Sequence, residues 1–302
     1  MFSFFRKTKK SDLNLGWRYF IDHQDLYADV FAEDNKYDDR DAISPEKIVW
    51  QMWWSKIDGM QMPALIKKCM ESCEFYCPDG YRRIVINNKN YTDYVKIPEI
   101  MLEKFHRGII SITHLSDYIR ISLLCEYGGI WSDATCFFTD KIPMEIVESK
   151  LFYFQSPTWI LHGYDVSKLV SFAYANLPAA VGTIHSGSNW FIVSNRRNKL
   201  LSVVKKILER YWEIEDSLID YYVFHCAVSW AILANKECRE EYSAMPCYSN
   251  ILPHLLQFSI ADELVGLDEV CKLSFCHKLT WKNKKINTRE KMILEKLNDF
   301  LV

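Results

Sequence analysis

Short runs of apolar and aromatic residues alternate, through the first half of the chain, with stretches where apolar residues recur at helical spacing. The short runs predict buried strands at 47–53, 81–86 and 130–133. The longer stretches predict helices over residues 63–77, 98–106 and 116–127, the last capped by Thr113 or Ser116 and ended by Gly128-Gly129. This alternation indicates an α/β fold with a mainly parallel, Rossmann-like central sheet flanked by helices.

The second half is less regular but carries the same two patterns. Strands are predicted at 151–154 and 189–193, and helices at 200–212, 222–234 and 289–302. We therefore expect three parts: an N-terminal lead-in over 1–43, a single α/β domain over 44–282, and a C-terminal helix over 283–302. Extra helices at both ends would complete the fold.

Composition narrows the class of protein. The chain has 302 residues, 49% of them hydrophobic and 25% charged, which is typical of a globular protein. Aromatic residues reach 15%, which fits either stacking on sugars or bases or a bulky core. The formal net charge of −2 argues against a nucleic-acid partner, because such proteins carry a basic surplus on one face.

The ten cysteines do not indicate a disulfide framework. The N-terminus is too short and too soon charged for a secretory signal, and no apolar run is long enough to span a membrane. Cys69, Cys73 and Cys77 share one helical stripe, as small core residues do. We therefore expect reduced thiols and a cytoplasmic protein.

The densest polar cluster lies between the third helix and the strand after it. Asp117 and Arg120 are three residues apart, so they project from one side of the helix. Asp133 ends the next strand, and ligands of open α/β sheets bind beyond the carboxyl ends of their strands. A local ion pair on a solvated helix is the alternative interpretation of Asp117 and Arg120. At Asp133, an oxygen-seeking cation such as Mg²⁺ or Mn²⁺ is expected.

These residues carry a resemblance to a known family. The stretches 116–120 and 127–135 resemble the DXD-containing sugar-binding region of glycosyltransferase family 32, closest to its capsular polysaccharide synthesis branch. That branch typically reads Gly-Gly-Ile-Trp, one residue, then Asp-Ala-Thr, as residues 128–135 do. Further matches lie at 48–53, 188–192 and 277–282, in the order of the family.

The resemblance implies a GT-A fold, a nucleotide-sugar donor, a divalent metal (Mn²⁺ or Mg²⁺) and transfer with retention at the anomeric carbon. It implies that Asp133 contacts ribose, sugar or metal, and that Asp117 and Arg120 hold the donor sugar. These three are the expected catalytic residues. The other expected donor-binding residues are Ser132, Lys282, and Trp50 and Gln51 beside the nucleotide base, where the Trp50 ring would stack on uracil.

The metal site departs from the usual pattern at one position. Thr135 stands where a DXD motif has its second acid, a change common in this branch, and a hydroxyl is a weaker cation ligand than a carboxylate. The resemblance therefore implies metal ligands at Asp133, Thr135 and His277. For His277, a structural hydrogen-bonding role is the alternative. Lys278 and Lys282 could neutralise a leaving diphosphate, although exposed lysines usually only solubilise.

Four further residues are candidates for the acceptor or sugar platform. Asn189 and Trp190 offer an amide and a flat apolar face, with core packing as the rival for Trp190. Asp220 and His225 also recur in the branch, and a helix would place them on neighbouring faces.

The predicted function is transfer of a sugar, as a hexosyl group from a UDP-sugar, onto a growing capsular or surface polysaccharide. A non-catalytic sugar-nucleotide or glycan-binding protein with the same fold is the alternative, and Thr135 permits it. A lipid-linked acceptor would bring the enzyme to the inner face of the membrane. Two basic stretches that could touch the membrane, or be ordinary frayed termini, are 2–10 and 282–289.

Overall fold

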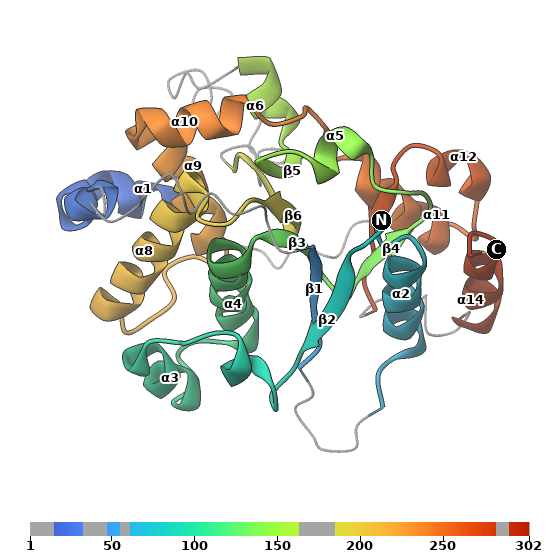
Figure 1. Cartoon of the computed structure of the whole chain (residues 1–302), viewed down its shortest axis with the longest axis horizontal. Helices are drawn as coiled ribbons and strands as arrows, with labels where there is room; N and C mark the ends of the chain where they lie inside the picture. The colour runs from blue at the N-terminus through green and yellow to red at the C-terminus, as the bar shows by residue number, and fades with distance from the viewer. Residues whose placement is uncertain (1–14, 33–46, 55–60, 163–184, 282–289, 302) are drawn as a thin grey trace.

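The computed structural model describes residues 15–32, 47–54, 61–162, 185–281 and 290–301. A five-stranded sheet forms its centre, in the order β2-β1-β3-β6-β5 (Figure 1). Its strands are β1 (Ile48–Met52), β2 (Arg82–Ile86), β3 (Gly129–Ser132), β5 (Leu151–Gln155) and β6 (Gly187–Ser194). β1 runs parallel to β2 and to β3, whereas β6 lies antiparallel to both β3 and β5. The sheet is therefore mainly parallel, with one reversed strand.

One face of the sheet packs against helices from the N-terminal and middle parts of the chain. Alternate residues along β1, Ile48 and Trp50, point to this face because side chains of a strand alternate between its two sides. Trp131 of β3 joins them in the same core. The helices that supply the rest are α1 (Leu15–Asp22), α3 (Glu99–His106), α4 (Ile112–Tyr127), α8 (Lys199–Ile214) and α9 (Val223–Ala234), together with the 3-10 helix η1 (Gln24–Phe31).

The opposite face packs against a second group of elements. Val49 and Ile130 from the sheet contact buried residues of α2 (Ala64–Phe75), α5 (Met144–Val147) and a small antiparallel sheet. That small sheet pairs β4 (Cys136–Phe138) with β7 (Cys276–Lys278). Beyond it lie α11 (Leu255–Ala261), α12 (Leu267–Cys271) and α14 (Glu290–Asn298), on the side of α2 in Figure 1. The remaining elements are α6 (Pro157–His162), α10 (Lys236–Ser243), η3 (Tyr91–Asp93) and η4 (Leu252–His254).

The α/β fold with a mainly parallel sheet flanked by helices is confirmed. Each predicted strand and helix has a counterpart, whereas β4 and β7 were not predicted. The predicted cap of α4 is wrong: the helix begins at Ile112, and the Ser111 side chain accepts a hydrogen bond from the backbone N–H of His114. Gly128 then ends α4 with a φ of 70°, a conformation that glycine adopts without a steric penalty.

The described part of the N-terminal region packs into the main core. Phe20 of α1 is fully buried and stacks on Trp230 of α9 at 5.7 Å between ring centroids. Tyr27 of η1 is fully buried as well. Residues 15–32 therefore share a core with the α/β domain that was predicted to begin at residue 44.

Two further sequence predictions concern cysteines and membranes. All ten cysteines have free thiols, as predicted. Among the described residues, no helix combines the length and apolar character needed to cross a bilayer.

Candidate functional site

Asp133 is the centre of a charged cluster at the carboxyl edge of the sheet. It directly follows β3, and its backbone N–H donates to the carbonyl of Trp190 on β6 at 2.8 Å, which fixes the end of the strand. The indole N–H of Trp131 donates to Asp133 Oδ1 at 2.9 Å. The Asp133 side chain is 23% exposed, so a ligand can reach it.

Arg120 links Asp133 to Asp117. Asp117 and Arg120 are three positions apart on α4, so both lie on the side of the helix that faces the end of β3. The Arg120 guanidinium donates through Nη1 to Asp117 Oδ1, and through Nη2 to Asp133 Oδ1 at 3.1 Å. Its Cζ lies 4.9 Å from the centroid of the Trp131 ring, a cation–π contact. The interpretation of Asp117 and Arg120 as a solvated ion pair is wrong, because Arg120 is buried.

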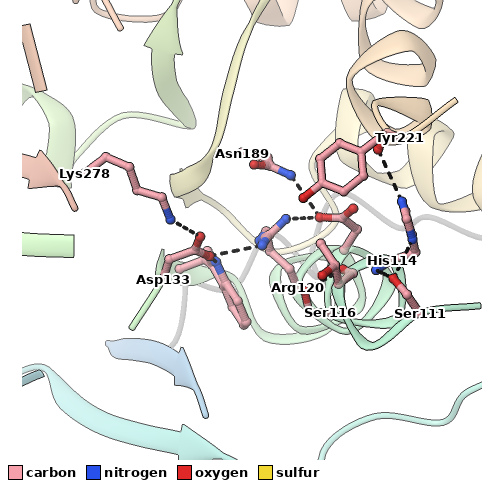
Figure 2. A network of polar contacts seen from close by, with 11 residues as sticks. Ser111, His114, Ser116, Arg120, Asp133, Asn189, Tyr221 and Lys278 are labelled. Carbon is pink, nitrogen blue, oxygen red and sulfur yellow. Dashed lines mark hydrogen bonds and ion pairs between the residues drawn. The ribbon is translucent and has the colours of Figure 1, made fainter. Parts of the chain in front are cut away.

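Lys278 reaches Asp133 from the other side (Figure 2). Its ammonium donates to Asp133 Oδ2 and to the Thr135 hydroxyl, both at 2.5 Å. β7 carries this lysine, and its pairing with β4 places Lys278 opposite Cys136, one residue after Thr135. Asp133 therefore accepts hydrogen bonds from two cationic side chains and one indole.

Asn189 extends the cluster on the α4 side. Its side-chain amide donates to Asp117 Oδ1 at 2.9 Å from the start of β6. Figure 2 shows Asn189 and Arg120 on the same side of the site, with Tyr221 and His114 beyond them. His114 is held by the Ser111 hydroxyl at 2.7 Å and by the Tyr221 carbonyl at 3.2 Å.

Burial and neighbouring charge act in opposite directions on the two carboxylates. Burial alone would raise the pKa of Asp133, but the charges of Lys278 and Arg120 outweigh it and lower that pKa. Burial dominates at Asp117 and raises its pKa, with Arg120 only partly offsetting it. Burial would lower the pKa of Lys278, but Asp133 raises it, so the ammonium stays charged at neutral pH. The site thus combines a firmly ionised Asp133 with two fixed cations.

The structure does not place the predicted base-binding residues where a base could stack. Trp50 is fully buried between the rings of Tyr94 and Tyr127, and its indole N–H donates to the Gly128 carbonyl at 3.0 Å. Gln51 is fully buried as well, and its side-chain oxygen accepts from Arg83. Trp50 and Gln51 belong to a strand covered on both faces, so the predicted contact of these side chains with uracil is corrected. Ser132, predicted to bind the donor, is buried on β3 in the same way.

The predicted acceptor residues separate into different places. Of the four, Asn189 joins the cluster through Asp117, whereas Trp190 is only 5% exposed and stacks on Phe154, so core packing explains it. Asp220 accepts from the backbone N–H of Gly16 at 3.0 Å and of Tyr222 at 2.8 Å, which ties α1 to the start of α9. These corrections leave only Asn189 at the site by direct contact.

His225 lies near the cluster without bonding to it. Its ring packs 5.2 Å from that of His185, and its Nδ1 is buried without a partner among the described residues. Burial, then the charges of His185 and Arg120, hold the pKa of His225 well below its usual range. His225 is therefore neutral at physiological pH.

Of the three residues predicted to hold a metal, Asp133 and Thr135 lie together, both in contact with Lys278, whereas His277 is turned away from them. His277 is fully buried and adjoins Lys278 on β7, so its ring points away from Asp133, towards the Cys271 carbonyl at 3.3 Å and the Thr139 hydroxyl at 3.2 Å. No group of three His, Cys, Asp or Glu side chains suited to a metal occurs in the part of the chain that the structure describes. The donor set does not fit a divalent cation, because both Asp133 oxygens already accept hydrogen bonds and His277 is turned away.

From the sequence, Lys278 was predicted only as a charge that could neutralise a leaving diphosphate, whereas it contacts Asp133 and Thr135 directly. The signal that could have found it was adjacency: a strand that turns His277 inward must turn Lys278 the other way. Lys282, preferred there as a donor-binding residue, lies outside the described residues, as do the basic stretches 2–10 and 282–289.

Together, the fold and the site define an α/β protein with a partly open, charged centre at the carboxyl edge of its sheet. The family model described as capsular polysaccharide synthesis protein matches residues 17–297. The chain belongs to this capsular polysaccharide synthesis family.

Two other comparisons add little. A solved structure described as PaToxG Glycosyltransferase is similar to this chain at 11% identity, covering 78% of this chain and 89% of that one, with a TM-score of 0.37. Among curated proteins, none matches the chain significantly.

Proposed function

We propose that this protein is a glycosyltransferase that moves a sugar from a nucleoside-diphosphate donor onto a growing capsular or surface polysaccharide. Its family and its α/β sheet with a charged centre at the carboxyl edge support the proposal. In finer detail, the protein has a GT-A-like fold, uses a UDP-sugar as its donor, and transfers a hexosyl group with retention at the anomeric carbon. The acceptor is a saccharide, lipid-linked and reached from the cytoplasm.

One observation carries the proposal: Asp133 lies between Arg120 and Lys278 and is partly exposed to solvent. A diphosphate that leaves a sugar develops negative charge, which fixed cations stabilise without reorganising. Arg120 and Lys278 are fixed in this sense, since each is held by a carboxylate. Asp133 positions both and keeps the centre from carrying an uncompensated positive charge before the donor binds.

Asp117 and Asn189 form the sugar side of the proposed site. Asp117 is oriented by Arg120 and Asn189, so its second oxygen can accept from a sugar hydroxyl. Such positioning lowers the barrier by holding the anomeric carbon within reach of the acceptor hydroxyl. With front-face attack, the departing phosphate oxygen takes the proton of the acceptor hydroxyl, and the protein needs no separate base.

A specific observation also favours the non-catalytic alternative. Both oxygens of Asp133 are engaged, and Thr135 replaces the second acid of the motif. A protein that only bound a sugar nucleotide would keep the cations and lack turnover. Comparison of Mn²⁺, Mg²⁺ and chelator in one experiment tests the metal requirement predicted from the sequence.

The experiment is nucleotide release from a panel of UDP-, GDP- and CDP-sugars, with acceptor oligosaccharide present or absent, in Mn²⁺, Mg²⁺ or chelator. Release of nucleotide from one sugar nucleotide of the panel identifies that compound as the donor. Asp133→Asn keeps the shape but removes the charge between two cations, and we expect a loss of about 100-fold or more in rate.

Asp140→Asn is the matched control, because Asp140 is an exposed aspartate just after β4. The Asp140→Asn variant should release nucleotide at the wild-type rate. Saturable binding of a donor with no release, with or without acceptor, would favour the binding protein. Equal release by Asp133→Asn and the wild type would remove Asp133 from the proposed site.

A further inference from the structure

The Lys278 ammonium occupies the space between two oxygens that the sequence assigns to a metal. Its Nζ is 2.5 Å from Asp133 Oδ2 and 2.5 Å from Thr135 Oγ1. These are the first and third positions of the Asp-Ala-Thr stretch. The Lys278 side chain is 21% exposed, so its ammonium borders the open part of the site.

The remaining oxygen of Asp133 is also in use. Oδ1 accepts from Arg120 Nη2 at 3.1 Å and from the Trp131 indole at 2.9 Å. A magnesium ion requires oxygen ligands at about 2.0–2.1 Å in octahedral geometry, and repels a neighbouring ammonium. A divalent cation could bind Asp133 Oδ2 and Thr135 only if the Lys278 ammonium left, and the pairing of β7 with β4 holds Lys278 opposite these residues.

We infer that Lys278 is the cation of this site, and that it takes over the charge-neutralising role of a divalent metal at Asp133 and Thr135. The inference rests on the proposed function for its chemistry. In the transfer, the bond between the anomeric carbon and the phosphate oxygen breaks, and a bond from the acceptor oxygen to that carbon forms. The acceptor proton ends on the departing nucleoside diphosphate, and Lys278 stays protonated while it donates to the diphosphate oxygens.

The first test needs no activity. Mn²⁺ binding is measured from the loss of the free-ion electron paramagnetic resonance signal, on the full chain without nucleotide. Wild type should not bind Mn²⁺ at this position, whereas Lys278→Ala opens the space beside two oxygens and should gain a site. The double variant Lys278→Ala/Asp133→Asn should lose that site again.

The second test measures affinity for UDP, GDP and CDP by titration calorimetry, in chelator and in Mn²⁺. For the nucleotide that binds, the wild-type Kd should be the same within about threefold in both buffers. Lys278→Ala in chelator should bind about 10- to 100-fold more weakly, the usual effect of losing a hydrogen bond to a charged group. Added Mn²⁺ should restore part of that loss in Lys278→Ala, which a purely structural role would not produce.

Two further variants complete the design. Lys278→Arg keeps the charge and should stay independent of Mn²⁺ even where its affinity falls. Lys272→Ala removes an exposed lysine six residues earlier and should match the wild type. Thermal melting of each variant separates loss of binding from loss of fold.

The outcomes separate this inference from the proposed function. Wild-type protein that binds Mn²⁺ and loses it in Asp133→Asn overturns the inference, whatever the activity. Release of nucleotide that stops in chelator and returns with Mn²⁺ overturns it too. Failure of all donors and nucleotides, with Mn²⁺ binding only in Lys278→Ala, would reject the glycosyltransferase and keep Lys278 as the cation of the site.

Discussion

At the scale of single residues, burial sets the charge of the histidines near the centre. Burial lowers the pKa of His277 to about 4, against the usual 6.5, and its bond to the Cys271 carbonyl only partly opposes this. His185 and His254 are lowered to about 4 for the same main reason. All three are neutral in the folded protein at pH 7, which makes them poor counter-ions for a diphosphate.

The acid sensitivity of the fold follows from this. A histidine whose pKa is lower in the folded than in the unfolded chain contributes stability that is fully present above pH 6.5. That contribution is lost as the pH falls from 6.5 towards 4. For fully buried His277, the loss between pH 7 and pH 5 is about 2 kcal/mol. His277→Gln should therefore lose about 2 kcal/mol less than the wild type over that interval in urea unfolding. Identical losses would mean that His277 does not titrate differently in the folded and unfolded chain.

At the scale of elements, α4 orients the charged side of the site. Its first turn is held by Ser111, whose extended backbone and hydroxyl form the cap. Ser111 also binds His114, which in turn contacts the Tyr221 carbonyl. The start of α4 is therefore tied to the loop before α9, and Asp117 and Arg120 follow within the next three turns.

Removal of the cap distinguishes the observed start of α4 from the predicted one. Ser111→Ala should reduce the free energy of unfolding by about 1 kcal/mol, the usual cost of losing an N-cap serine. Ser116→Ala is the matched control, because its hydroxyl only donates to the Thr113 carbonyl within the helix, and should change stability by about 0.5 kcal/mol or less. Urea unfolding of both variants measures the difference, and equal costs would contradict Ser111 as the cap.

The elements were largely predictable from the sequence, whereas the partners within the site were not. Apolar periodicity located the helices and strands because each buries one face or both. It could not tell that Trp50 would be enclosed by Tyr94 and Tyr127, since an aromatic residue in a strand gives the same sequence pattern whether its ring is covered or open. Nor could it pair Lys278 with Asp133, because these residues are 145 positions apart in the chain and their contact depends on the pairing of β4 with β7.

At the scale of the whole molecule, one core joins the N-terminal helices to the α/β domain. Phe20 and Tyr27 pack against Trp230 of α9, and Tyr211 of α8 packs against Phe20. Gly16 lets α1 lie close to Asp220, because a Cβ on Gly16 would be only 2.8 Å from the Cβ of Asp220. The N-terminal region is thus a structural part of the domain that carries the site.

Stability should reflect that shared core. Phe20→Ala should cost about 3–5 kcal/mol, the usual range for a buried phenylalanine. Ile21→Ala, on the exposed side of the same helix, should cost about 1 kcal/mol or less. Urea unfolding measures both. Equal and small costs would show that α1 contributes little to the stability of the domain.

The position of Lys278 has a consequence for the making of the protein. A ribosome adds about 5–20 residues per second, so the 145 residues between Asp133 and Lys278 take roughly 7–29 s to synthesise. During that interval, a nascent chain already contains Asp117, Arg120 and Asp133 but has no β7 to pair with β4. Each newly made molecule therefore acquires its charged centre only after residue 278 has been translated, and a messenger that ends before that codon yields a chain without one.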